Sequence, residues 1–123
     1  MRLLIVDDSN IVRNRIARIA TLGTIPGLSI TGLAKNGAEA VNMCRKDPPD
    51  VITMDLTMPE MDGIECIAKL IALGADSRIL VISALADKST ALKAMKLGAH
   101  GFINKPFTDE QLTAALLELK EPI

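Results

Sequence analysis

The chain has 123 residues, a net charge of −1 and 49% apolar side chains, which fits one folded domain spanning residues 1–123. The near-neutral charge argues against general nucleic-acid binding, and no apolar run approaches the roughly 20 residues that a membrane helix needs. Because the amino-terminal residues also lack the order of a secretory signal, we expect a cytoplasmic protein without direct nucleic-acid or membrane contacts.

Strand-like and helix-like patterns alternate five times along the chain. Apolar runs such as Leu3–Val6 and Ile79–Ile82 do not alternate with polar residues, which indicates strands covered on both faces. Capping-box-like pairs precede several helices, and Gly74 and Gly98 stand where helices end. The predicted strands are 2–6, 29–34, 50–54, 78–82 and 101–103. The predicted helices are 9–22, 37–46, 63–73, 87–97 and 109–120.

This alternation predicts an α/β fold, a doubly wound five-stranded parallel sheet with helices on both faces, in three layers. The second strand is interrupted by Gly32, so we place it at an edge. Ligands of such folds bind beyond the carboxyl ends of the strands.

Functional groups follow four of the predicted strands at that end. Asp7 and Asp8 follow the first strand, Asp55 the third and Ser83 the fourth, and Lys105 follows the fifth through one intervening residue. Each alone is ordinary, since an Asp after a strand is usually a helix N-cap. Together they form an oxygen-rich site that suits Mg²⁺, or Mn²⁺ as the alternative ion, better than zinc.

The same groups match what phosphoryl transfer requires. A carboxylate such as Asp55 can attack phosphorus and form an aspartyl-phosphate. The reaction mainly needs in-line positioning and neutralised phosphoryl oxygens, and a metal ion, Lys105 and Ser83 can each take one oxygen.

Two further groups have ordinary interpretations. Arg13, Arg15 and Arg18 cluster on the first helix, and we interpret them as a solvated helix face. Cys44 and Cys66 belong to no ligand pattern, so we expect two reduced, half-buried thiols, with a disulfide as the open alternative.

At the functional residues, the chain resembles the receiver domain of bacterial two-component response regulators, most closely the single-domain chemotaxis type. The resemblance covers nearly the whole chain and is carried by Val6-Asp7-Asp8-Ser9, the segment from Asp55 to Gly63, Ile82-Ser83-Ala84 and Lys105-Pro106-Phe107. It implies a flavodoxin-like sheet in the order 2-1-3-4-5, an order already known for the chemotaxis member of this family.

The resemblance also implies that Asp55 accepts a phosphoryl group from a sensor histidine kinase or a histidine phosphotransfer protein. By the same resemblance, Asp8 and Asp55 bind Mg²⁺ through their side chains and Thr57 through its backbone carbonyl, while Asp7 reaches the ion through water. Ser83 and Lys105 would bind the phosphoryl oxygens.

A switch follows from the resemblance. The Lys105-Pro106 bond is expected to be cis, Ser83 moves toward the phosphoryl group, and Phe102 swings inward. Phe102 lacks the hydroxyl of the Tyr that relatives often carry, and a buried strand aromatic is its ordinary alternative. The signal would reach a downstream protein through the surface of the fourth helix, fifth strand and fifth helix. That surface offers three exposed lysines, Lys88, Lys93 and Lys96, and an exposed Leu117. We interpret His100 as a solvated turn residue.

Thr57 and Leu85 are poor groups for orienting a hydrolytic water, so we expect slow loss of the phosphoryl group.

The expected protein is a signalling module that assists only its own reactions, as a monomer or a weak phosphorylation-dependent dimer. The alternatives are a receiver fragment of a larger regulator, an aspartyl-phosphate hydrolase, a flavin carrier and a module with a vestigial site. The hydrolase needs a second Asp where Thr57 stands, and a flavin carrier needs a phosphate loop and stacking aromatics, which this chain lacks.

Overall fold

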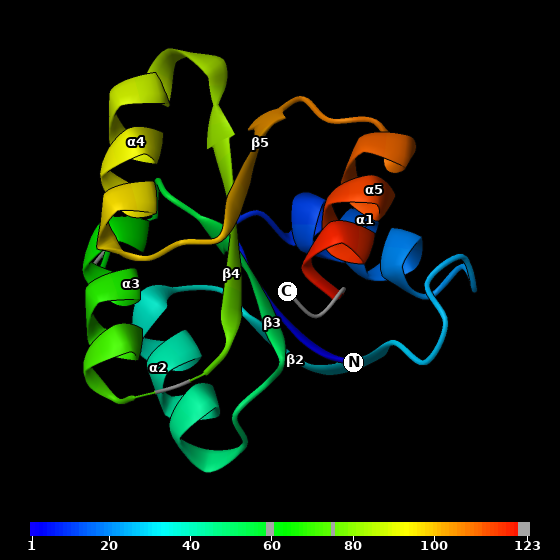
Figure 1. The fold of residues 1–123 in the computed structure, drawn as a ribbon, viewed down its shortest axis with the longest axis horizontal. Helices are drawn as coiled ribbons and strands as arrows, with labels where there is room; N and C mark the ends of the chain where they lie inside the picture. The colour runs from blue at the N-terminus through cyan, green and yellow to red at the C-terminus, as the bar shows by residue number, and fades with distance from the viewer. Residues whose placement is uncertain (59–60, 75, 121–123) are drawn as a thin grey trace.

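The computed structural model describes residues 1–58, 61–74 and 76–120. Within these residues, five parallel strands form one sheet in the order β2-β1-β3-β4-β5, which confirms the predicted order (Figure 1). The strands are β1 (Arg2–Val6), β2 (Ser29–Ala34), β3 (Val51–Asp55), β4 (Arg78–Ala84) and β5 (Gly101–Lys105).

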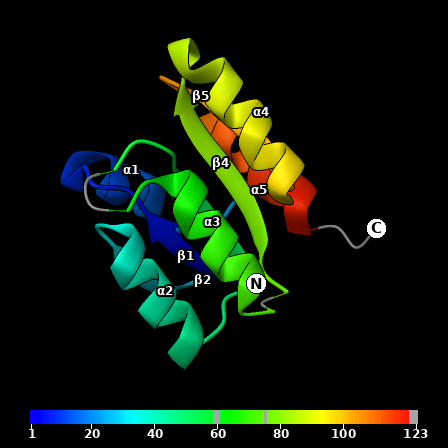
Figure 2. The ribbon, with the colours of Figure 1, turned by 90° about the vertical axis from the view of Figure 1, so that its left-hand side faces the viewer.

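Helices cover both faces of the sheet. α2, α3 and α4 lie on one face and α1 and α5 on the other (Figures 1 and 2). The helices are α1 (Asn10–Ala20), α2 (Gly37–Lys46), α3 (Gly63–Ala72), α4 (Lys88–Leu97) and α5 (Asp109–Lys120), and a short 3-10 turn, Leu85–Asp87, precedes α4. None of the helices within the described residues is both long and apolar enough to cross a membrane.

Two apolar cores lie between the sheet and its helix layers. In β1, Leu4 and Val6 belong to the core under α2, α3 and α4, whereas Leu3 and Ile5 belong to the core under α1 and α5. All four side chains are almost completely buried. This burial on both faces explains why the strands read as continuous apolar runs rather than alternating ones.

Side-chain caps begin α1, α2, α3 and α5 close to the predicted positions. Thr108 and the side chain of Gln111 satisfy each other's backbone N–H groups, at 3.0 and 2.9 Å, which completes a capping box. The first helix begins at Asn10 rather than at residue 9, because Ser9 is its N-cap and accepts from the Val12 N–H. β4 and β5 each run two residues further than predicted, because Ser83 pairs with Asn104 and the ladder continues to Lys105.

Both cysteines are free, as expected, but their predicted half-burial is wrong. Cys44 and Cys66 are 2% and 0% exposed in the core under α2 and α3. Burial raises the pKa of Cys44 to about 11 and that of Cys66 to about 12, so both thiols stay protonated and behave as small apolar side chains.

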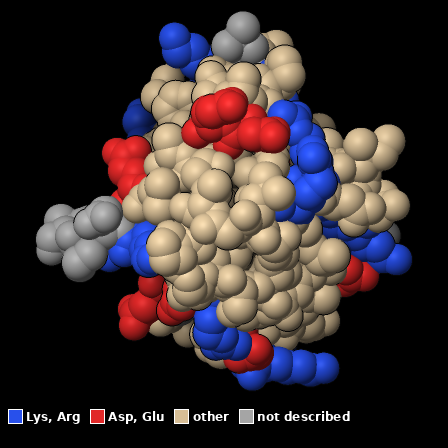
Figure 3. All heavy atoms as spheres, turned by 90° about the vertical axis from the view of Figure 1, so that its right-hand side faces the viewer, with Lys and Arg blue, Asp and Glu red and all other residues tan. Residues whose placement is uncertain are grey.

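The face formed by α1 and α5 carries charges of both signs. In Figure 3, acidic and basic side chains lie among large uncharged areas and neither sign forms a continuous field. This face therefore offers no basic track of the kind that nucleic acid needs.

Candidate functional site

Three carboxylates meet at the carboxyl ends of two neighbouring strands. β1 pairs with β3, so the loop after Val6 brings Asp7 and Asp8 beside Asp55, the last residue of β3. One carboxylate oxygen from each aspartate lies within 4.8 Å of the others. Asp7 and Asp55 are 1% and 4% exposed, whereas Asp8 is exposed and faces solvent. An oxygen-only group of this size fits a hard divalent cation.

Lys105 brings a positive charge between two of these carboxylates. Its Nζ lies 3.1 Å from Asp7 Oδ2 and 3.3 Å from Asp55 Oδ1. Burial alone would lower the pKa of Lys105, but Asp55 and Asp7 outweigh it and raise that pKa, so the ammonium stays charged. The Lys105-Pro106 peptide bond, just beyond the ammonium-bearing residue, is cis.

The carboxyl group of Asp55 has a raised pKa in the metal-free protein. Burial is the largest cause and the charge of Asp7 the next, and together they exceed the opposing effects of Lys105 and of the Thr57 N–H. The pKa of Asp55 rises to about 6. The folded chain therefore holds a concentrated negative charge that a bound cation would relieve.

Ser83 and Thr57 complete the rim of the site. Ser83 is the last residue but one of β4 and follows Ile82, the register partner of Asp55. Its Oγ is buried without a hydrogen-bond partner among the described residues. The N–H of Thr57 donates to Asp55 Oδ1 at 3.3 Å, and the Thr57 hydroxyl donates to Asp87 at 3.4 Å. A buried hydroxyl without a partner is costly, so the hydrogen-bonding capacity of Ser83 Oγ is unused in this structure among the described residues.

Phe102 lies on β5, opposite Val81 and two residues before the strand partner of Ser83. It is 43% exposed, so the alternative of a buried strand aromatic is wrong. Its ring lines a groove of about 820 Å³ along β5 between α4 and α5, together with His100, Met95 and Ala114.

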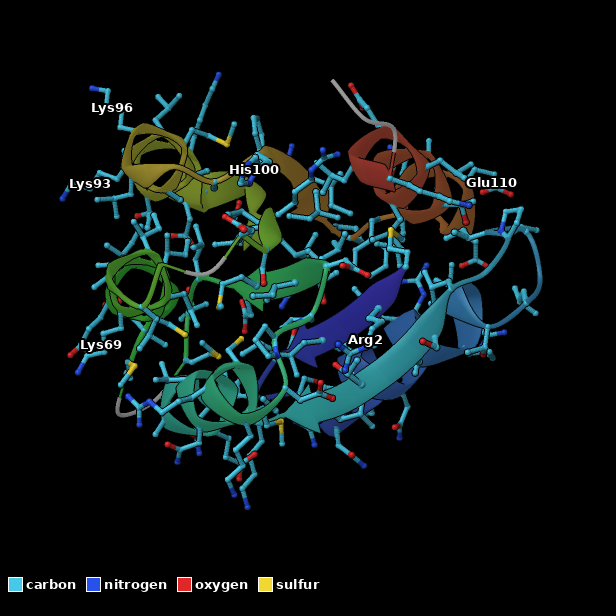
Figure 4. All side chains as sticks on the ribbon, turned by 60° about the horizontal axis from the view of Figure 1, so that its bottom comes forward. Arg2, Lys69, Lys93, Lys96, His100 and Glu110 are labelled. Carbon is cyan, nitrogen blue, oxygen red and sulfur yellow. The ribbon has the colours of Figure 1, made fainter. Side chains whose placement is uncertain are left out.

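The surface around that groove agrees only in part with the predictions. The lysines of α4 are exposed, and Figure 4 shows Lys93 and Lys96 pointing away from the sheet. Leu117 is not exposed as predicted but partly buried, because it packs against the core under α1 and α5. His100 is exposed, yet it is not merely solvated: its Nδ1 accepts a hydrogen bond from the Ile79 N–H at 3.0 Å.

The sequence did not predict that Gly63, Arg13 and Arg15 contact the backbone around the site. Gly63 allows the start of α3 to approach β3, and its N–H donates to Leu56 O at 3.0 Å. Arg13 and Arg15 are not a solvated face, because each guanidinium donates to a backbone carbonyl beside the site. The Gly was visible as part of the motif that begins at Asp55, but no local pattern pointed to the arginine contacts. Residues Pro59 and Glu60 of that motif and the side chain of Leu85 lie outside the described residues.

Replacing Gly63 with Ala should destabilise the fold by about 1 to 3 kcal/mol. An added Cβ would stand 2.5 Å from Asp55 O and 2.6 Å from Leu56 Cα, so the backbone under the site must shift. Urea unfolding of the variant measures the loss. Gly101→Ala is the matched control, because its added Cβ meets nothing nearer than 3.6 Å and should change stability by less than about 0.5 kcal/mol. Equal losses in both variants would contradict the close-approach argument.

Comparison with known proteins agrees with this geometry. A family model described as the response regulator receiver domain matches residues 3–117. The chain is 39% identical to the chemotaxis protein CheY of Thermotoga maritima over 94% of this chain and 93% of that protein. It is also 42% identical to a protein-glutamate methylesterase/protein-glutamine glutaminase of Archaeoglobus fulgidus, over 86% of this chain but 30% of that protein. A crystal structure of the CheX-CheY-BeF3-Mg+2 complex from Borrelia burgdorferi superposes with a TM-score of 0.90 at 30% identity, covering 99% of this chain and 90% of that one.

Proposed function

Because this chain belongs to the family of response regulator receiver domains, of the CheY-like chemotaxis type, we propose that it accepts a phosphoryl group on Asp55. The donor is a phosphohistidine of a sensor histidine kinase or of a histidine phosphotransfer protein. The observation that carries the proposal is the meeting of three carboxylates within 4.8 Å, with the Lys105 ammonium 3.3 Å from Asp55. That arrangement offers a nucleophile, a cation site and a positive charge at one edge of the sheet.

The donor set fits Mg²⁺, with Mn²⁺ as the alternative ion, because every side-chain ligand is a carboxylate oxygen. Asp8 and Asp55 would hold the ion with their side chains and Thr57 with its backbone carbonyl, and Asp7 would act through water. When bound, the ion neutralises charge on the phosphoryl oxygens. The CheX-CheY complex of Borrelia burgdorferi was crystallised with BeF3 and Mg+2, and this likeness supports the assignment.

The remaining chemistry belongs to residues of this chain. A carboxylate oxygen of Asp55 bonds to phosphorus as the bond from phosphorus to the donor imidazole nitrogen breaks, and that nitrogen keeps the electron pair. Lys105 then pairs with one phosphoryl oxygen, and the Ser83 hydroxyl donates to another. The unpartnered, buried state of Ser83 Oγ supports this role.

The movement of Ser83 toward the phosphoryl group would carry the signal to the α4-β5-α5 surface. Phe102, now 43% exposed, would turn toward the space that Ser83 leaves. Because Phe102 has no hydroxyl, burial of its ring is the driving force. The altered groove would then bind or release a downstream protein of a chemotaxis-type pathway.

The protein would then be a signalling module that acts on its own Asp55 and turns over no external substrate. Residues 1–123 would form one receiver unit that works as a monomer or as a weak phosphorylation-dependent dimer. A receiver portion of a larger regulator is the second candidate, and the match to only 30% of the Archaeoglobus fulgidus methylesterase favours it.

Incubation with Mg²⁺ and acetyl phosphate, followed by intact mass measurement, tests the proposal. We expect one added phosphoryl group, none after Mg²⁺ is chelated, and none in Asp55→Asn. A hydrolase would instead release phosphate over many turnovers from added phosphate esters. A flavin carrier or a module with a vestigial site would give no adduct, and either result would reject the proposal.

Leu85→Glu should shorten the lifetime of the phosphoryl group on Asp55 by about tenfold or more. A carboxylate two residues after Ser83 can orient the water whose oxygen attacks phosphorus while the bond to Asp55 breaks. The decay of the adduct after removal of acetyl phosphate measures the lifetime. Leu85→Met, which keeps an apolar side chain of similar size, serves as the control. A Glu variant whose adduct decays no faster than that of the parent would contradict this prediction.

A further inference from the structure

Helix α1 contacts the segments on either side of the ion pair between Asp7 and Lys105. Arg13 donates through Nη1 to the backbone carbonyl of Asp7 at 2.6 Å and through Nη2 to Asn10 Oδ1 at 3.1 Å. The loop that carries Asp7 is therefore tied to the first turn of α1.

Arg15 makes three contacts with the loop after β5 and with the first residue of α5. Its Nη2 donates to Phe107 O at 2.6 Å and lies 3.3 Å from Asp109 Oδ1. Its guanidinium carbon stands 4.6 Å from the centroid of the Phe107 ring. α1 and α5 lie side by side, so these contacts span the layer on that face of the sheet (Figure 1).

The ring that Arg15 covers is part of the core. Phe107 is 5% exposed and packs in the core under α1 and α5, and it follows Lys105 by two residues. The backbone at Phe107 thus fixes where the Lys105 side chain begins. Lys105 itself has a long flexible stem and 28% side-chain exposure, so its position depends on that anchor.

We infer that Arg15 is a positioning residue for Lys105. It holds the loop at Phe107 so that the ammonium stays between Asp7 and Asp55, where it meets the phosphoryl group. This inference rests on the proposed function of Asp55. Arg is suited to the task because one planar guanidinium can donate to a carbonyl, pair with a carboxylate and lie over a ring at once, which an ammonium cannot do.

A small displacement of the loop at Phe107 should slow the labelling of Asp55, because it moves the Lys105 ammonium. A displacement of about 1 Å in a reacting group can cost on the order of a hundredfold in rate. Loss of the Arg15 contacts leaves the core packing of Phe107 in place, so we expect a smaller change, about tenfold.

The test compares Arg15→Met with the matched control Arg18→Met on the same helix. The Arg18 side chain is exposed and makes no hydrogen bond or ion pair among the described residues. The rate of Asp55 labelling by acetyl phosphate with Mg²⁺ should fall about tenfold in Arg15→Met and stay within about twofold in Arg18→Met. Arg15→Lys should give an intermediate rate, and it provides a second variant if the Met variant does not fold.

A double-mutant cycle separates positioning from general stability. In a Lys105→Met background, Arg15→Met should cause no further loss of labelling rate, because the group that Arg15 positions is already absent. The nuclear Overhauser contacts of the Lys105 side chain give a readout independent of labelling, and they should weaken in Arg15→Met and stay unchanged in Arg18→Met.

The outcomes distinguish the two proposals. If the parent protein itself acquires no phosphoryl group on Asp55, the proposed function fails. If the parent is labelled but Arg15→Met matches Arg18→Met, or slows labelling equally with and without Lys105, the inference about Arg15 is overturned.

Discussion

Replacing Asp55 with Asn should make the metal-free protein more stable at pH 7, by roughly 1 to 3 kcal/mol. The raised pKa of Asp55, about 6, means that its ionised form destabilises the folded state, and this value already includes the favourable charge of Lys105. Asn removes the charge while keeping the shape of the side chain. Urea unfolding in the presence of a chelator measures the gain, because any bound Mg²⁺ would stabilise the parent alone.

The gain should depend on pH in a defined direction. The folded state holds the Asp55 proton more tightly than the unfolded chain, whose value is near 3.8. As the pH falls from 7 through about 6 toward 4, the parent regains the stability that the ionised carboxylate removed, so the difference between parent and Asp55→Asn should vanish. Asp76→Asn, at an exposed position, is the control and should change stability by less than about 0.5 kcal/mol throughout. A variant that is less stable than the parent at pH 7 would contradict the argument.

Much of the fold was predictable because its signals are local. Continuous apolar runs such as Leu3–Val6 indicate strands buried on both faces, and pairs such as Thr108 with Gln111 indicate helix starts. The ends of β4 and β5 were less predictable. Ser83 and Lys105 extend their strands because the two strands pair with each other there, and such pairing is a property of the sheet rather than of either segment.

The candidate site was predictable because its members each follow a strand, and parallel strands end at one edge. The contacts that position these residues were not predictable. Arg15 and Phe107 stand 92 positions apart in the chain, and nothing in the pattern of α1 distinguishes Arg15 from the solvent-exposed Arg18. The exposure of the Phe102 ring was also not predictable from the sequence, because the burial of a β5 side chain depends on how α4 and α5 flank this edge strand.

Replacing Lys105 with Met should have the opposite effect to Asp55→Asn. The ammonium lies within 3.3 Å of both Asp7 and Asp55, so its loss leaves two buried carboxylates without their counter-charge. Because the side chain of Lys105 is partly exposed, we expect a loss of about 1 to 3 kcal/mol at pH 7, below the range for breaking a fully buried pair. Labelling of Asp55 by acetyl phosphate should slow on the order of a hundredfold, since a phosphoryl oxygen loses its positive partner.

The pH dependence of Lys105→Met identifies the cause of that loss. The raised pKa of Lys105 means that its stabilising charge is fully present at pH 7 and would disappear only at alkaline pH, above its ordinary value of 10.5. In the Met variant, the pKa of Asp55 should rise further, so lowering the pH to about 5 protonates that carboxyl and returns most of the lost stability. The double variant Lys105→Met with Asp55→Asn should be more stable than Lys105→Met alone at pH 7, because only one buried carboxylate then remains. A loss that is equal at pH 5 and pH 7, and unchanged in the double variant, would mean that Lys105 stabilises the fold by packing and not by charge.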